Sequence, residues 1–324
     1  MDTVTSQDTA VTLPRAAVSE PWWTPARREA LMGWLFALPW VLGFLVFTAG
    51  PMLFSLYSSF TRYNIIADPA WVGTQNYNNI FTNDSMFWKS IENTFVLVGS
   101  KVPIVLVAAL GIALLLNMRL PGSKFFRAVI YMPSIFSGVA AIFLWQWILA
   151  PSGLFNDALD VVGIDGPAWF TNPDWTKPGL IVMGMWWIGG NVLIFLAGLK
   201  AIPETLYEAA DIDGANPLQK LRYVTLPLLS STIFFQVVTS IIGTFQIFTT
   251  VYIISGDQSA LGGPEQSLLF YVLYLYNRAF GKVGVGGLQM GYASALAWIL
   301  FIIILVITFA QLRLAKRWVY YESE

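Results

Sequence analysis

The residue types that most often carry enzymatic chemistry are missing from this chain of 324 residues. It contains no Cys and no His, which removes thiolate nucleophiles, the commonest metal ligand and the usual general base. It also contains no Gly-x-x-x-x-Gly-Lys-Ser/Thr string, the loop whose backbone amides cradle nucleotide phosphates. We therefore predict no catalytic residue, no bound metal ion and no cofactor in this chain, and we expect that it is not an enzyme.

Polar residues inside apolar segments suggest a different chemistry, the binding of a solute through hydrogen bonds. In the segment 226–255, polar and small residues recur at positions i, i+4, i+7 and i+8 from Gln236, so they share one helical face. Aromatic rings can stack on the C–H faces of an uncharged sugar while amides and hydroxyls bind its hydroxyl groups. The predicted solute-lining set is Ser134, Trp186, Trp187, Asn191, Gln236, Ser240, Gly243, Thr244 and Gln246. Helix packing is the alternative interpretation, because small and polar residues also mediate it in membranes and Trp is common at interfaces.

Composition indicates where these residues must be positioned. The chain is 56% hydrophobic and only 11% charged, which leaves too few polar residues to cover a soluble surface. Windows of about 20 apolar residues are long enough to cross a bilayer as helices. Such windows lie within or near residues 31–60, 95–117, 128–149, 179–199, 226–255 and 290–312. We predict an all-α polytopic membrane protein with six transmembrane helices.

The distribution of Lys and Arg predicts the orientation of these helices, because basic residues are retained on the cytoplasmic side. Twelve basic residues fall in the two termini and the alternate loops that follow the second and fourth spans, against five in the other loops. Both termini and the loop at about residues 200–225 are therefore predicted to be cytoplasmic.

The N-terminal segment and one buried charge need separate interpretation. Residues 1–30 are predicted to form a cytoplasmic tail, and residues 31–324 a single six-span domain. Arg27 and Arg28 precede a full-length span rather than the short apolar region of a signal peptide, so we expect this span to remain as an anchor. Lys101 is the charge well inside a predicted span, near its outer third. This position favours snorkelling of its ammonium to the outer headgroups over contact with a solute or a partner protein.

The loop at about residues 200–225 has the pattern of two short helices. Carboxylates cluster in the first half, where a helix dipole favours them, Gly214 is predicted to end the first helix, and Asn216 precedes the second. The small side chains of Ala209 and Ala210 allow another protein to approach closely, while the charges fix its register. The alternative is an amphipathic loop that only covers the bundle.

The residues of this loop carry a resemblance to a known family. Glu208 begins the string Glu-Ala-Ala, Gly214 follows six residues later, and Leu226 and Pro227 stand at 18 and 19 residues. This order closely resembles the signature loop of permease subunits of binding-protein-dependent ABC importers, and residues 202–215 look like the carbohydrate-uptake branch of maltose and glycerol-phosphate type. Residues 153–156 and 167–170 are similar to the periplasmic loop of the maltose-type first permease subunit.

The resemblance implies a pore-forming subunit of the plasma (inner) membrane of a bacterium or archaeon that imports a sugar or sugar-like solute by alternating access. Its implied partners are a second permease subunit in a heterodimeric pore, two ABC ATPase subunits that hold ATP and Mg, and an extracytoplasmic solute-binding protein, with no nucleic acid. The residues implied to couple to the ATPase are Glu208, Ala209, Ala210, Asp213 and Gly214. An ion-coupled secondary carrier is the alternative, and it would need coupling charges or inverted repeats.

Overall fold

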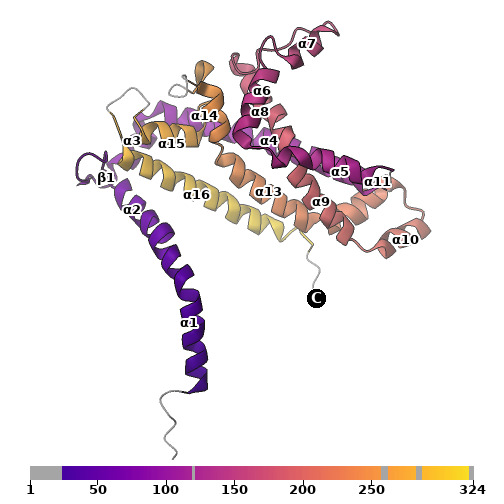
Figure 1. The fold of residues 1–324 in the computed structure, drawn as a ribbon, viewed down its shortest axis with the longest axis horizontal. Helices are drawn as coiled ribbons and strands as arrows, with labels where there is room; N and C mark the ends of the chain where they lie inside the picture. The colour runs from indigo at the N-terminus through magenta and orange to yellow at the C-terminus, as the bar shows by residue number, and fades with distance from the viewer. Residues whose placement is uncertain (1–23, 119–120, 257–261, 282–286, 321–324) are drawn as a thin grey trace, which may run out of the picture. The chain divides into compact units, whose positions relative to one another are not determined.

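The computed structural model describes residues 24–118, 121–256, 262–281 and 287–320, which are almost entirely helical (Figure 1). The one sheet among them is a two-stranded antiparallel pair, β1 (Thr61–Arg62) and β2 (Ala70–Trp71). The chain divides into two units, residues 1–54 and residues 55–324. Residues 1–23 of the predicted tail, and the basic residues Arg15, Arg119 and Lys282, lie outside the described residues.

The first unit is built from one long helical segment. It contains α1 (Pro25–Phe44), the π-helical turn η1 (Leu45–Ala49) and the start of α2 (Gly50–Ser59), which continues into the second unit. The Thr24 side chain caps α1 by accepting a hydrogen bond from the Arg27 amide at 3.4 Å, so the helix begins inside the segment predicted to be a tail. No residue of α1 or η1 is buried within the chain, and their large apolar side chains suit a surface covered by lipid.

The second unit contains the remaining helices. Their bounds are α3 Gln75–Asn83, α4 Ser85–Asn117, α5 Ser123–Tyr131, η2 Met132–Ile135, α6 Gly138–Ile148, α7 Leu154–Asp160, α8 Pro173–Gly184, η3 Met185–Trp187, α9 Gly189–Ala201, α10 Glu204–Ile212, α11 Pro217–Lys220, η4 Leu221–Thr225, α12 Leu226–Leu228, α13 Ser230–Phe245, α14 Thr249–Ser255, η6 Pro264–Gln266, α15 Tyr271–Ala279 and α16 Met290–Ala315.

Six segments of the described chain can cross a membrane when each bent helix pair counts as one span. Four are long helical segments, Pro25–Ser59, Ser85–Asn117, Ser230–Ser255 and Met290–Ala315. The other two are Ser123–Ile135 with Gly138–Ile148, bent by 102°, and Pro173–Trp187 with Gly189–Ala201, bent by 54°. Both bends follow a 3₁₀ turn, a tighter helix that commonly interrupts α-helices. The predicted all-α polytopic fold is confirmed, although the sharp bend in the third span was not anticipated.

The core of the second unit forms around α4, which packs most extensively on α9 and α13. Its buried residues Val102, Leu106, Ala109 and Ala113 recur every three or four positions, the spacing that places side chains on one helical face. Phe195 of α9 and Leu229, which immediately precedes α13, are buried in the same apolar cluster. The interior is therefore an ordinary apolar helix interface, in which each polar side chain needs a specific partner.

Polar side chains tie the ends of the helices together. The Asn93 side chain in α4 donates hydrogen bonds to the carbonyls of Gln266 at 2.8 Å and Leu269 at 3.1 Å, which fixes the segment before α15. At the start of α16, a Cβ on Gly291 would lie 2.0 Å from the Thr61 carbonyl oxygen. Only glycine allows the backbone of β1 to approach α16 this closely.

Candidate functional site

A polar cavity lies within the second unit where α4, α8 and η3, α9 and α13 meet. Its volume is about 240 Å³. We call this space the central cavity. Its lining residues are Lys101, Val102, Val105, Gly184, Trp187, Asn191, Ser240, Gly243 and Thr244. The cavity therefore brings together Trp187, Asn191, Ser240, Gly243 and Thr244 of the predicted solute-lining set.

Gln236, predicted to line the solute site, instead links two helices. Its amide nitrogen donates a hydrogen bond to the Asn191 backbone carbonyl at 3.0 Å, and its side-chain oxygen accepts one from the Asn191 amide at 3.4 Å. The Gln236 residue is only 3% exposed, so these bonds satisfy an amide that would otherwise be costly to bury. Gln236 therefore does not line the central cavity. It holds in place Asn191, which does line the cavity.

The adjacent tryptophans of η3 have different surroundings. Trp187 lines the central cavity and also a second space of about 360 Å³, which Ser137, Gly138, Thr249 and Thr250 border. Trp186 instead packs edge-on against Trp145 of α6, with ring centroids 5.7 Å apart. Trp187 is therefore the indole shared by two polar spaces, whereas Trp186 serves helix packing.

Two further predicted residues do not line the central cavity. The Ser134 hydroxyl is buried, and it would lie 3.1 Å from a Cβ on Gly189, so Ser134 marks a close helix crossing. Gln246 is the C-cap of α13 and is exposed. Thr249 and Thr250 were not among the predicted residues; they are polar residues at the start of α14, immediately after the break that ends α13.

The predicted coupling segment folds as the helix–glycine–helix that the sequence indicated. Gly214 has a φ of +73°, and two hydrogen bonds close the end of α10, from the Gly214 amide to the Asp211 carbonyl at 3.1 Å and from the Ala215 amide to the Ala210 carbonyl at 2.9 Å. This is the Schellman arrangement, which favours glycine at the left-handed position. Asn216 and Gln219 then form a reciprocal capping box at the start of α11.

The surface of this segment is exposed and partly apolar. Glu208, Ala209, Asp213 and Gly214 are exposed and Ala210 is half-buried. Two large apolar side chains stand beside them without cover, Ile212 at 87% exposure and Leu218 at 72%. Exposed apolar side chains next to charges are typical of a surface that another protein covers.

The segment is also fixed to the span that follows it. The Lys220 ammonium pairs with the Asp211 carboxylate, which joins α11 to α10. The Tyr207 hydroxyl lies 3.0 Å from the Thr225 hydroxyl, just before α12 and α13. In Figure 1 the segment lies at the end of the second unit away from α3 and α15. A displacement of α10 would therefore be passed to the helix that carries Ser240 and Thr244.

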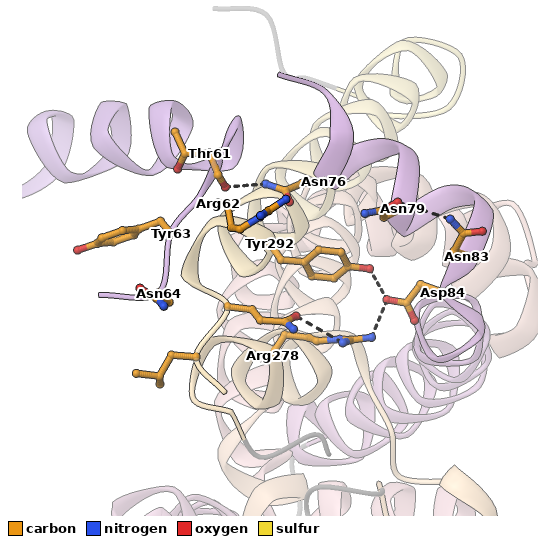
Figure 2. Close-up of a pocket in the computed structure, with 12 residues that line it drawn as sticks. Thr61, Arg62, Tyr63, Asn64, Asn76, Asn79, Asn83, Asp84, Arg278 and Tyr292 are labelled. Atoms are coloured by element: carbon orange, nitrogen blue, oxygen red, sulfur yellow. Dashed lines mark hydrogen bonds and ion pairs between the residues drawn. The ribbon is translucent and has the colours of Figure 1, made fainter. Parts of the chain in front are cut away.

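A second polar pocket lies at the α3 and α15 end and is shown in Figure 2. Its volume is about 440 Å³. We call this space the end pocket. Its lining residues are Thr61, Arg62, Tyr63, Asn64, Asn76, Asn79, Asn83, Asp84, Arg278, Leu288, Gln289 and Tyr292. The abundance of amides makes it a hydrogen-bonding surface rather than an apolar one.

Asp84 is the centre of a buried cluster in the floor of the end pocket. Its carboxylate accepts a hydrogen bond from the Tyr292 hydroxyl and pairs with Arg278 at 3.2 Å (Figure 2). It also accepts a hydrogen bond from the Tyr274 hydroxyl. It also caps α4 by accepting a hydrogen bond from the Phe87 amide at 3.1 Å. The Asp84 side chain is 4% exposed, so four donors compensate the burial of one negative charge.

This environment changes the acidity of the nearby phenol. Burial, together with the hydrogen bond to Asp84, raises the pKa of Tyr274 well above its ordinary value. The hydroxyl therefore stays protonated and remains a donor. This cluster was not predicted from the sequence, although an Asp directly before a helix of apolar residues is a recognisable N-cap signal.

Comparison with known proteins agrees with the fold and assigns the chain to a family. Residues 86–320 match the family described as binding-protein-dependent transport system inner membrane component, and the chain belongs to that family. It is 42% identical to the probable ABC transporter permease protein YesP of Bacillus subtilis, over 92% of this chain and 94% of that protein. It is 34% identical to the lactose transport system permease protein LacF of Rhizobium radiobacter, over 88% and 94%.

Solved structures support the same architecture. A chain of a bacterial alginate ABC transporter, crystallised with an alginate pentasaccharide-bound periplasmic protein, superposes with a TM-score of 0.75 at 22% identity. The match covers 92% of this chain and 98% of that chain. At this identity the likeness extends to the polytopic helical fold alone.

Proposed function

We propose that this chain is the pore-forming subunit of an importer that carries a sugar into the cytoplasm while a partner protein hydrolyses ATP. The observation that carries the proposal is the central cavity, where an indole, an amide and two hydroxyl side chains from three segments of the chain line one space. These are the groups that bind the C–H faces and hydroxyls of a saccharide. Relatives named for transport of lactose and of arabinooligosaccharides support the sugar class.

The exposed face of α10 and α11 is proposed to dock on an ABC ATPase subunit. Glu208, Ala209 and Gly214 form its small, polar part, and Ile212 and Leu218 supply the apolar contact that needs cover. ATP and Mg would be bound by that ATPase. Closure of two such subunits would move α10, and the links through Lys220 and Thr225 would carry the movement to α13. ATP would thereby favour one of two global states of the pore, which is alternating access.

A second permease subunit is proposed to complete the pore. The central cavity, at about 240 Å³, is smaller than the roughly 300–1,000 Å³ typical of a small-molecule site. One chain would thus supply only one wall of the solute site. A heterodimeric pore with two ATPase subunits is the assembly that we propose.

An extracytoplasmic solute-binding protein is the remaining proposed partner, and the end pocket is its proposed contact. The pocket presents Arg62, Asn64 and Asn76 at the opposite end of the unit from α10. In the orientation that we propose, α10 is cytoplasmic, so the end pocket would face the outside.

Uptake into proteoliposomes tests the proposal. The chain is co-purified with its partner subunits, reconstituted with its binding protein, and offered labelled saccharides with and without internal ATP. We expect uptake only with ATP. Uptake that follows an ion gradient without ATP would instead indicate a secondary carrier and refute the proposal.

A pair of variants connects uptake to the central cavity. Replacing both hydroxyls, by Ser240→Ala with Thr244→Val, removes hydrogen bonds worth about 0.5–1.5 kcal/mol each, so affinity should fall up to roughly a hundredfold. Thr239→Val is the matched control, because Thr239 is exposed on the same helix and bonds only to its own backbone. Equal effects of the two changes would remove the central cavity from the solute path.

A further inference from the structure

Lys101 is the one charged side chain among the described residues that line the central cavity. It stands in the middle of α4, inside a membrane-spanning segment, and faces α8. A Cβ on Gly184 would lie 2.9 Å from the Lys101 Cε, so the missing side chain at Gly184 provides the space through which the lysine stem passes. The structure thus places Lys101 in the cavity lining, not on an outer face from which snorkelling would be expected.

The described part of the chain provides Lys101 with no counter-ion. The ion pairs among the described residues join other side chains, such as Arg278 with Asp84 and Lys89 with Glu92. Lys101 makes neither an ion pair nor a hydrogen bond with any described residue. The residues that share the central cavity with Lys101 carry no carboxylate. Arg278 shows the contrast, because that half-buried cation has a carboxylate oxygen at 3.2 Å.

An ammonium within a membrane span is costly unless water or an anion compensates it. An uncharged sugar would need only the hydrogen-bonding groups that Asn191, Ser240 and Thr244 already supply. A cation beside them adds one specific capacity, a charge-assisted hydrogen bond to an anionic group. The cavity therefore has the chemistry for a ring stacked near Trp187 whose negative substituent reaches Lys101.

We propose that the solute carried through this pore is an acidic saccharide, and that Lys101 pairs with the carboxylate of a sugar acid during passage. This inference rests on the proposed function and specifies its substrate class. The ammonium would discriminate between a uronic acid and the neutral sugar of the same stereochemistry, which differ in one carboxylate.

The test uses the complete complex with its binding protein in proteoliposomes containing ATP. The vesicles are offered a mixture of short neutral galacto-oligosaccharides and short galacturono-oligosaccharides, together with partial hydrolysates of other neutral and acidic plant polysaccharides. Mass spectrometry identifies the imported sugars. We expect acidic members to be imported, and Lys101→Gln to lower their import about tenfold or more, the factor expected from a lost bond to a charged group. Lys101→Arg, which keeps the positive charge, should retain a large part of the import of acidic sugars.

A chemical rescue separates the charge of Lys101 from its packing. The chain has no cysteine, so Lys101→Cys introduces a single thiol when the partner subunits are made thiol-free. Reaction with aminoethyl methanethiosulfonate restores an ammonium, whereas methyl methanethiosulfonate leaves a neutral side chain. Import of acidic sugars should recover only with the first reagent. Recovery with both reagents would mean that Lys101 acts by filling space.

The remaining outcomes distinguish this inference from the proposed function. ATP-dependent import of neutral sugars alone, or import of acidic sugars that Lys101→Gln leaves unchanged, would overturn the inference while the proposed function stands. A failure of every sugar to enter with ATP would overturn both.

Discussion

The Asp84 cluster predicts a large and specific loss of stability. Asp84→Ala removes the carboxylate but leaves the hydroxyls of Tyr274 and Tyr292 and the guanidinium of Arg278 in place. The side chain of Asp84 is 4% exposed and that of Arg278 is 16% exposed, so water replaces the lost partner poorly. Breaking a buried ion pair from one side costs about 3–5 kcal/mol, and this is the expected change in the free energy of unfolding.

Asp84→Asn should be milder. The amide oxygen can still accept a hydrogen bond, but the charge is gone, so the expected loss is about 1.5–3 kcal/mol. Unfolding by SDS titration, followed by far-ultraviolet circular dichroism of the purified complex, measures both values. Asp68→Ala is the control, because Asp68 is exposed and should change the free energy by less than about 0.5 kcal/mol.

A double-mutant cycle makes the interpretation refutable. If Asp84 and Arg278 act as a pair, the loss caused by the double alanine variant should be smaller than the sum of the single losses by about 0.5–3 kcal/mol. Additive losses, or an Asp84→Ala protein as stable as wild type, would show that the pair contributes nothing and that the cluster does not hold α15 and α16 to α4.

The same cluster predicts a pH dependence. Because burial and the bond to Asp84 raise the pKa of Tyr274 in the folded state, the folded protein holds a proton that the unfolded chain releases above about pH 10. This contribution to stability is complete below about pH 10 and is lost as the pH rises further. Tyr274→Phe should be less stable at pH 7 and should lose less stability between neutral and alkaline pH.

Three further predictions concern the cavity, the coupling segment and the topology. Ser240→Cys should react with a water-soluble thiol reagent, and bound solute should slow this reaction. Ile241→Cys should stay unreactive, because Ile241 lines a separate apolar space. Equal reaction rates of the two variants would mean that the helical face of Ser240 and Thr244 serves only helix packing. Gly214→Asn, which tolerates the left-handed φ of +73°, should couple ATP hydrolysis to uptake better than Gly214→Val, and identical coupling would exclude a backbone requirement. A reporter fused after Lys220 should score cytoplasmic and one after Asp160 external; the opposite pattern would invert the orientation.

The spans and the coupling segment were predictable because their signals are local. A run of apolar residues long enough to cross a bilayer specifies a membrane helix without knowledge of its neighbours. The end of α10 was similarly encoded, since Gly214 supplies the backbone conformation that the hydrogen bonds of Ala215 and Gly214 require. Capping and helix length depend on residues close in sequence.

The composition of the cavity was predictable only in part. Helical periodicity placed Ser240, Gly243 and Thr244 on one face, and they do line one space. The same periodicity included Gln236, but the amide of this residue is used by Asn191 on another helix, 45 residues away. Which polar side chain is satisfied by a neighbouring helix depends on the packing of spans, and a single sequence does not contain it.

The Asp84 cluster illustrates the same limit over a longer range. Asp84 and Tyr274 are separated by 190 residues and Asp84 and Tyr292 by 208, so no local pattern connects them. Asp84 caps α4, which is a local feature, but the burial of its carboxylate depends on Tyr274 of α15 and Tyr292 of α16, which are distant in sequence.

The order of elements between the predicted coupling segment and the central cavity suggests how the proposed docking of α10 would affect the cavity. From α10 the chain passes through α11, the π-helical turn η4 and α12 directly into α13, which carries Ser240 and Thr244. Two side-chain contacts connect the residues on either side of Gly214: the Lys220 ammonium pairs with the Asp211 carboxylate, and the Thr225 hydroxyl lies 3.0 Å from the Tyr207 hydroxyl. We expect α10 and α11, joined by these contacts, to move together, so that a displacement at Ile212 would reach α13. The π-helical turn, where the hydrogen-bond ladder is irregular, is then the place where we expect the body to pivot.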